Sequence, residues 1–414
     1  MAPSANYKYF IHIENYGRTF CACIVLVAGI IFAMYSTPQY FTSENDHTFN
    51  FISVWYDQIA GMDKKLQISF YSKDNSVEMY DIRSKKIFLK RVHIDGIEEK
   101  DLYVGNTVVI LSRQLKIVDY ADEFTRNEIS RRRQRTFAMV KPDAVHRIGE
   151  IIDLLQNRKF EVTQMKMVRL TKNQAKKFYE EHSERGFYEE LVSYMTSGPV
   201  IAMELVGEEA VDNWRQTLGP TDSGVARDQF PDTVRALFGT NKQLNAAHGS
   251  DSTSSATREL SFFFGDSGSG KSEIRATALL QNTTCCIVKP HAIKAGHLGK
   301  ILSAILQEGF EVTALQMVRL EKSEAEEFLE VYKEVLAEYP RMVHQLTSGP
   351  LVALEISSSD QDKTHESFRS FVGPMDPDVA LELYPHSLRA RFGQDKVKNG
   401  VHCSDLPEDG PLEV

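Results

Sequence analysis

The sequence is poor in cysteine and has no excess of positive charge. Its 414 residues include only five cysteines, at positions 21, 23, 285, 286 and 403. That is too few for a disulfide framework, and no two of them have the CxxC spacing of a zinc site, which favours a reducing compartment. The 48 basic and 57 acidic side chains leave a net charge of −9. The chain as a whole therefore has no electrostatic reason to bind nucleic acid.

Long apolar runs are also scarce. The run at 20–35, FCACIVLVAGIIFAMY, falls at the lower limit for a membrane-spanning helix, which needs about 20 apolar residues. A signal peptide is an alternative, but the flank before the run is weakly charged and no clear cleavage site follows it. We therefore expect residues 1–46 to be an N-terminal extension or a buried segment, and membrane anchoring to be unlikely.

A repeat organises most of the chain. Segments 137–206 and 285–356 share the motifs VKP, FEVT, MVRL and TSGP, and the copies then continue alike to NAAHGSD and NGVHCSD. The two copies differ in length by only a few inserted residues, because the lysines at 141 and 289 are 148 residues apart and the histidines at 248 and 402 are 154 apart. Each copy alternates strand, helix, strand, helix and strand, which predicts helices covering a sheet of about four strands.

The region before the repeats has a different pattern. Residues 47–133 contain short alternating strands separated by turn sequences such as SKDNS, which predict a small β-rich domain with its own core. The run RRRQR at 131–135 joins this domain to the first copy. Such a run is usually a solvated linker, and less often a site for acidic peptides such as the tails of tubulin.

One motif conflicts with its surroundings. GDSGSGKS, at 265–272, matches the phosphate-binding pattern GxxxxGK[ST]. However, SATRELSFFF before it completes the last predicted helix of the first copy, and the Gly/Ser-rich run lies where two copies must be joined. We interpret residues 265–283 as a flexible linker and expect Lys271 to take no part in nucleotide binding.

The first copy gathers hydrogen-bond donors around one histidine. A neutral imidazole is a competent nucleophile near pH 7, and phosphoryl transfer then needs little beyond in-line positioning and neutralisation of charge on the phosphate oxygens. The recurrence of this histidine in both copies favours a function for it. The residues that suit this chemistry are Lys141, Tyr179, Arg215, Thr221, Arg235, Asn245 and His248.

The motifs VKPDA, RGFYEELVSYMTSGPVIAME, RQTLGPT, TVRALFG and NAAHGSDS resemble those of the nucleoside diphosphate kinases across nearly all of 136–264. The resemblance implies an α+β protein with two ferredoxin-like βαββαβ domains, at 134–264 and 284–414. It implies exchange of the γ-phosphate of ATP with nucleoside diphosphates through a phosphohistidine, with Mg²⁺ carried by the nucleotide.

The resemblance also assigns roles by position. His248 matches the phosphorylated histidine, Glu259 matches the acid that orients it, and Tyr179 matches a phosphate contact beside them. Nucleotide-binding roles fall to Lys141, Phe187, Arg215, Thr221, Arg235 and Asn245, with Phe187 stacking on the base. Two departures are three extra residues between Thr221 and Arg235, and Lys242 where a valine usually packs against the base.

The second copy keeps part of this set: Lys289, Arg369, Arg389, Asn399 and His402. Met375 replaces the threonine and Cys403 a glycine, while Tyr332 and Tyr339 are the nearest substitutes for the Tyr/Phe pair. Glu413 has the offset of the orienting glutamate but follows LPEDGP, a poor helix sequence. We expect the second copy to act as a structural partner in a pseudo-dimer, with catalysis at His402 as the alternative.

The N-terminal region, from FNFISVWYD to KIVDY, resembles the DM-ten domain found in ciliary proteins of doublet microtubules. This implies tubulin or axonemal microtubule proteins as partners, and a place in the cytoskeleton, the ciliary axoneme and the centrosome. Two functions remain: a nucleoside diphosphate kinase tethered to microtubules, or a structural axonemal protein that uses the kinase fold as a scaffold. The complete residue set of the first copy favours the enzyme.

Overall fold

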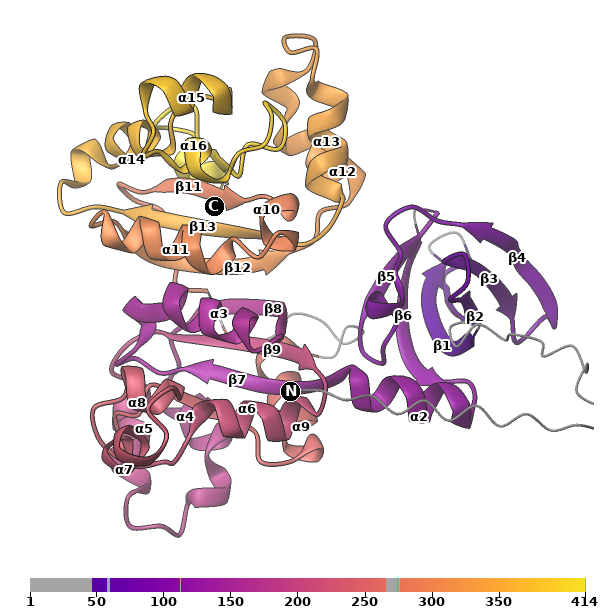
Figure 1. Ribbon diagram of the computed structural model, residues 1–414, viewed down its shortest axis with the longest axis horizontal. Helices are drawn as coiled ribbons and strands as arrows, with labels where there is room; N and C mark the ends of the chain where they lie inside the picture. The colour runs from indigo at the N-terminus through magenta and orange to yellow at the C-terminus, as the bar shows by residue number, and fades with distance from the viewer. Residues whose placement is uncertain (1–46, 58–59, 112, 266–273, 275, 414) are drawn as a thin grey trace, which may run out of the picture.

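The computed structural model describes residues 47–57, 60–111, 113–265, 274 and 276–413. The apolar run at 20–35 and Lys271 lie outside these residues. Figure 1 shows an N-terminal β-rich body beside two stacked α+β bodies. Among the helices of the described ranges, none is long and apolar enough to cross a membrane.

The N-terminal body is a six-stranded antiparallel sheet in the order β4-β3-β2-β1-β6-β5. Its inward side chains alternate along the strands, and the core they form includes Phe49, Phe51, Leu66 and Ile68. This confirms the predicted β-rich fold. The strands are β1 (Thr48–Asp57), β2 (Met62–Tyr71), β3 (Ser76–Asp81), β4 (Lys86–His93), β5 (Thr107–Ile110) and β6 (Arg113–Tyr120).

Helix α2 (Glu123–Arg132) links this sheet to the first copy, and the arginines at its end belong to regular structure, although Arg131 and Arg132 are exposed. The run 131–135 ends α2 and begins strand β7 (Gln134–Val140). Each arginine has a carboxylate partner within the chain: the pairs are Arg131–Glu209, Arg132–Glu128, Arg133–Glu161 and Arg135–Glu204. The linker prediction was therefore wrong, because the run ends a helix and begins a strand, and the pairs of Arg131, Arg133 and Arg135 join it to the first copy.

The first copy has the ferredoxin-like order, with four strands arranged β10-β7-β9-β8. Its central strand β9 is buried along its whole length. Helices cover one face of the sheet, and loops together with further helices cover the opposite face. The further strands are β8 (Glu161–Val168), β9 (Val200–Gly207) and β10 (Ala247–Gly249). The helices are α3 (Ile148–Asn157), α4 (Lys172–Phe178), α5 (Tyr188–Met195), α6 (Ala210–Leu218), α7 (Ser223–Gln229), α8 (Val234–Phe238) and α9 (Thr253–Phe264).

The second copy repeats this order, with strands arranged β12-β13-β11-β14, which confirms the predicted fold class. Its three cysteines, Cys285, Cys286 and Cys403, are free and buried. The strands are β11 (Thr284–Val288), β12 (Glu311–Val318), β13 (Leu351–Ser357) and β14 (Val401–Cys403). The helices are α10 (Pro290–Lys294), α11 (Leu298–Gln307), α12 (Lys322–Phe328), α13 (Tyr339–Thr347), α14 (Thr364–Val372), α15 (Pro377–Leu383), α16 (Leu388–Phe392) and α17 (Gly410–Glu413).

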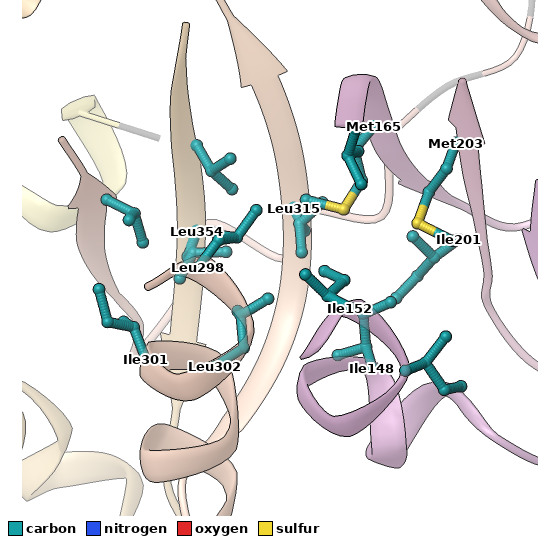
Figure 2. Packing of buried hydrophobic residues seen from close by; sticks show 14 of the residues in the cluster. Ile148, Ile152, Met165, Ile201, Met203, Leu298, Ile301, Leu302, Leu315 and Leu354 are labelled. Carbon is teal, nitrogen blue, oxygen red and sulfur yellow. The ribbon is translucent and has the colours of Figure 1, made fainter. Parts of the chain in front are cut away.

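The two copies pack directly on each other. Strands β8 and β12 pair antiparallel, with Lys166 opposite Gln316, so the two sheets form one sheet of eight strands. Below this joint, α3 and α11 pack together, and apolar side chains from both copies share one core (Figure 2). The helices meet at Gly149 and Gly299, where a Cβ atom on either would lie 2.6 Å from the carbonyl oxygen of the other. Only glycine permits this approach.

The connection between the copies is partly fixed. Thr277 donates to the carbonyl of Thr313, and the amides of Leu279 and Leu280 donate to the carboxylate of Glu355 at 2.8 and 2.7 Å. The prediction of a flexible linker is therefore wrong for its last part. Residues 276–281 also form no helix, whereas a P-loop is followed by one.

Candidate active site

Strand β10 presents His248, and a buried carboxylate fixes its ring. The Nε2 atom of His248 lies 3.1 and 3.2 Å from the two carboxylate oxygens of Glu259 on α9. Ser250 donates its hydroxyl to the same carboxylate at 2.6 Å, and Glu259 is only 6% exposed. Because a carboxylate accepts hydrogen bonds, the ring proton is on Nε2. In the neutral ring, Nδ1 is then left with a lone pair, as a nucleophile requires.

Aromatic rings enclose the other sides of His248. The rings of Phe137, Phe178 and Tyr179 have their centroids 6.0, 5.5 and 6.1 Å from the imidazole. The hydroxyl of Tyr179 is buried and has no hydrogen-bond partner within the described residues, and burial raises its pKa. An unsatisfied buried hydroxyl costs about 1–3 kcal/mol. It is a donor that a bound ligand can satisfy.

The turn before His248 is strained. Ala246 has φ of +68°, a left-handed conformation that L-residues other than glycine adopt at a cost. Its carbonyl accepts from the amide of Lys141 at 2.8 Å, and its amide donates to Asp143 at 3.0 Å. These two bonds hold the turn that delivers His248 to the site. Sequence analysis did not single out Ala246 or Asp143, although Gly400 at the matching place of the second copy was a signal.

Lys141, Asn245 and the chain at Thr221 form one connected group. The ammonium of Lys141 donates to Asn245 at 2.7 Å, and burial lowers the pKa of this lysine to about 8. The amide nitrogen of Asn245 donates to the carbonyls of Thr221 and Lys242 at 2.9 and 3.0 Å. The group thus places a buried cation beside the β10 strand.

Two guanidinium groups complete the positive side of the site. Arg235 donates to the carbonyls of Gly219 at 2.8 Å and Ala247 at 3.3 Å, and Arg215 donates to the carbonyl of Asp251 at 3.2 Å. Burial and the neighbouring charge of Arg215 lower the pKa of Arg235 to about 10. Within the described part of the chain, neither guanidinium pairs with a carboxylate. Two close, unneutralised cations favour an anion between them.

Phe187 is an exposed aromatic residue at the start of α5. It precedes α5 directly and is 52% exposed. The side chain of Gln243 donates to the carbonyl of Glu190 on α5 at 3.4 Å. The loop that carries Lys242 is thereby tied to the helix that Phe187 begins.

The second copy keeps the histidine and its acid. Nε2 of His402 lies 3.2 Å from the carboxylate of Glu413, and Ser404 donates to that carboxylate at 2.7 Å. The expectation that LPEDGP denies Glu413 a helix was wrong, because Glu413 ends the short helix α17. Lys289 donates to Asn399 at 2.8 Å, and burial lowers its pKa to about 7.

The aromatic positions of the second copy differ from the predicted correspondence. Leu329 takes the place of Tyr179, since each directly follows the phenylalanine that ends α12 or α4. Tyr339 matches Tyr188, because both begin their helices and donate a hydroxyl to a carbonyl of the helix before. Tyr332 donates to Asp405. The assignment of Tyr332 and Tyr339 to the Tyr/Phe pair was therefore wrong.

The remaining frame is similar in both copies. Arg389 donates to the carbonyls of Gly373 at 2.9 Å and Val401 at 3.3 Å, as Arg235 does at the matching carbonyls. Asn399 donates to the carbonyl of Met375 at 3.1 Å. No group of three acidic, histidine or cysteine side chains suited to a metal ion occurs among the residues with described positions.

A paired histidine and glutamate beside unneutralised cations, on a duplicated βαββαβ fold, define a class of phosphate-handling proteins. The chain belongs to the nucleoside diphosphate kinase family, whose model matches residues 134–268 and 282–414. This confirms the family predicted from the sequence.

Two curated relatives resemble the chain over most of its length. It is 46% identical over 379 residues to proteins named nucleoside diphosphate kinase homolog 7 from Rattus norvegicus and Mus musculus. Each match covers 91% of this chain and 94% of the relative. Among solved structures, the Aquifex aeolicus nucleoside diphosphate kinase is 45% identical, covering 31% of this chain and 92% of that chain, with a TM-score of 0.31.

Proposed function

We propose that the first copy transfers the γ-phosphate of a nucleoside triphosphate to a nucleoside diphosphate through a phosphohistidine on Nδ1 of His248. The observation that carries this proposal is the Glu259–His248 pair, which commits Nε2 and leaves Nδ1 with its lone pair. The unpartnered hydroxyl of Tyr179 and the unneutralised Arg215 and Arg235 supply donors for a phosphate beside it.

The exchange balances in two half-reactions. Nδ1 attacks the γ-phosphorus, a P–N bond forms, and the bond from phosphorus to the β–γ bridging oxygen breaks, so that a nucleoside diphosphate leaves with its Mg²⁺. Glu259 stabilises the positive imidazole ring during this step. A terminal phosphate oxygen of the second diphosphate then attacks the phosphorus, the P–N bond breaks, and the neutral imidazole returns. Arg215, Arg235 and the Mg²⁺ of the substrate neutralise the equatorial oxygens.

The test is incubation with γ-labelled ATP. His248→Asn keeps the polarity but removes the nucleophile, so we expect the acid-labile label on the protein to disappear while the circular dichroism spectrum is unchanged. The wild-type chain supplies the positive control. Undiminished label in the variant would place the phosphorylated residue elsewhere and refute the proposal.

We further propose that the N-terminal body tethers this activity to ciliary and centrosomal microtubules, with tubulin or axonemal proteins as partners. Supporting this, β4 is an edge strand of the sheet and exposes Lys86 and Lys90 in a chain that is acidic overall. The arginines of 131–135, in contrast, already have acidic partners. Such a basic edge suits an acidic partner.

The tether is tested in the full-length chain. Lys86→Glu combined with Lys90→Glu is expected to abolish localisation to axonemes while nucleotide exchange continues, and His248→Asn is expected to stay localised. Normal localisation of the double variant would exclude this edge as the tether.

A further inference from the structure

The second copy contains a cavity of about 490 Å³ in front of His402. Two of its lining residues, Arg369 and Arg389, carry guanidinium cations, and Lys289 and Asn399 add donors. Cations that share one cavity repel each other, so an anion between them is favoured. Two acidic residues, Glu366 and Asp405, also line the cavity.

Asp405 bridges two of the lining side chains. One oxygen of its carboxylate accepts from a guanidinium nitrogen of Arg369 at 2.7 Å, and the other accepts from the hydroxyl of Tyr332. Burial alone raises the pKa of Asp405, but the hydrogen bonds from Tyr332 and Arg369 hold it below the usual value. The carboxylate is therefore a bound anion at neutral pH.

The first copy has the same aspartate in a different arrangement. The carboxylate of Asp251 accepts from the hydroxyl of Ser252 at 3.1 Å, and Arg215 donates to the backbone carbonyl of Asp251. Hydrogen bonds from Ser255 and Ser252, and the charge of Arg215, lower the pKa of Asp251, but Arg215 makes no hydrogen bond to its carboxylate among the described contacts. His182 takes the place of Tyr332, since both end the short 3-10 helix that follows α4 or α12. In the first copy, Arg215 therefore has no hydrogen bond to a carboxylate among the described contacts. In the second copy, Arg369 donates to the carboxylate of Asp405.

The base-binding side of the second cavity is also altered. Glu338 directly precedes α13, where Phe187 directly precedes α5 in the first copy. A carboxylate offers no face on which a base can stack. What the second cavity keeps are the contacts for phosphate.

We infer that the second copy is a binding site for a polyphosphate chain, and that the carboxylate of Asp405, held by Tyr332, occupies the position of one phosphate on Arg369. This inference rests on the proposed function, because it takes the arginines of the first copy as phosphate contacts. A polyphosphate binds by displacing the carboxylate from Arg369. Removing the competing carboxylate from Arg369 therefore increases the affinity of the second copy for polyphosphate. The base of a nucleotide contributes nothing to this affinity.

The test is calorimetric titration of the full chain carrying Arg215→Ala, which weakens the first site. Inorganic tripolyphosphate and ADP are the two probes. Asp405→Asn removes the competing charge and Tyr332→Phe removes its anchor, and each is expected to tighten the binding of tripolyphosphate at least tenfold. The affinity for ADP is expected to increase by the same factor. Tyr339→Phe, which removes a hydroxyl outside the cavity, serves as the matched control and is expected to change nothing.

A third substitution assigns the gain to the cavity. When Arg369→Ala is added to Asp405→Asn, the gain in affinity for tripolyphosphate is expected to disappear. Unchanged affinity in both variants, a gain that survives Arg369→Ala, or a gain for ADP alone would each overturn the inference. Phosphorylation of His248 in the wild-type chain is measured separately, so failure of the proposed function and failure of this inference give different results.

Discussion

The joint between the two copies predicts that one added methyl group destabilises the chain. In Gly299→Ala, the new Cβ would lie 2.6 Å from the carbonyl oxygen of Gly149 and 2.7 Å from the amide nitrogen of Asp153. Both are backbone atoms of α3, so no side chain can move aside. The two helices must separate by several tenths of an ångström, which loosens the shared core of Figure 2.

Overpacking of this kind costs about 1–3 kcal/mol. The gain in helix propensity from glycine to alanine opposes it by at most about 1 kcal/mol, and less at the second residue of α11. We expect a net loss near 1–2 kcal/mol, which lowers the melting temperature by about 2–8 °C for domains of this size.

The assay is thermal unfolding, combined with hydrogen exchange of the amides of β8 and β12. Gly349→Ala is the control, because its Cβ would lie 3.5 Å from the nearest atom, an ordinary contact with Pro290. A melting temperature unchanged in Gly299→Ala, with unaltered exchange at β8 and β12, would refute the close packing of the helices.

Three further predictions concern other sites. Gly400→Ala should destabilise the chain by about 1–2 kcal/mol in unfolding experiments, because φ is +85° at Gly400, whereas Ala246→Gly should not destabilise it. Burial and the charge of Lys289 lower the pKa of His291 to about 4 from a usual 6.5. Its neutral ring therefore stabilises the fold above pH 6.5, and this stability is lost as the pH falls from 6.5 to 4; His291→Gln should flatten this dependence in melting curves. Lys271→Ala should leave the exchange rate within twofold of wild type, and a large loss would restore the P-loop interpretation.

Much of the fold was predictable because the chain contains it twice. The shared VKP, FEVT and TSGP motifs fix the length and element order of each copy without any estimate of helix or strand propensity. The pairing of β8 with β12 was not predictable, because an alternating edge strand looks the same whether its edge is free or covered. The partners of Arg133 and Arg135 lie 28 and 69 residues away, so sequence position gave no sign of them.

The second site shows where local sequence misleads. Gly410 and Pro411 argue against a helix, yet proline is compatible with the first turn, and the hydroxyl of Ser404 helps to fix Glu413 in place. Tertiary contacts therefore overrode propensity. Conversely, Tyr332 and Tyr339 were matched by residue type, whereas the helix ends show that neither replaces Tyr179.

Fusion of the two copies changes how their joint can evolve. In a homodimer, a mutation at the twofold axis appears on both sides at once, and the interface must accept both. Here Gly149 faces Ser303 while Gly299 faces Asp153, although the two contacts are related by the pseudo-symmetry of the sheet. Each half of the joint can change alone, and so can each pocket. Because the duplication is covalent, the second copy can have Leu329 in place of the tyrosine and can pair Arg369 with Asp405, while the site of the first copy stays unchanged.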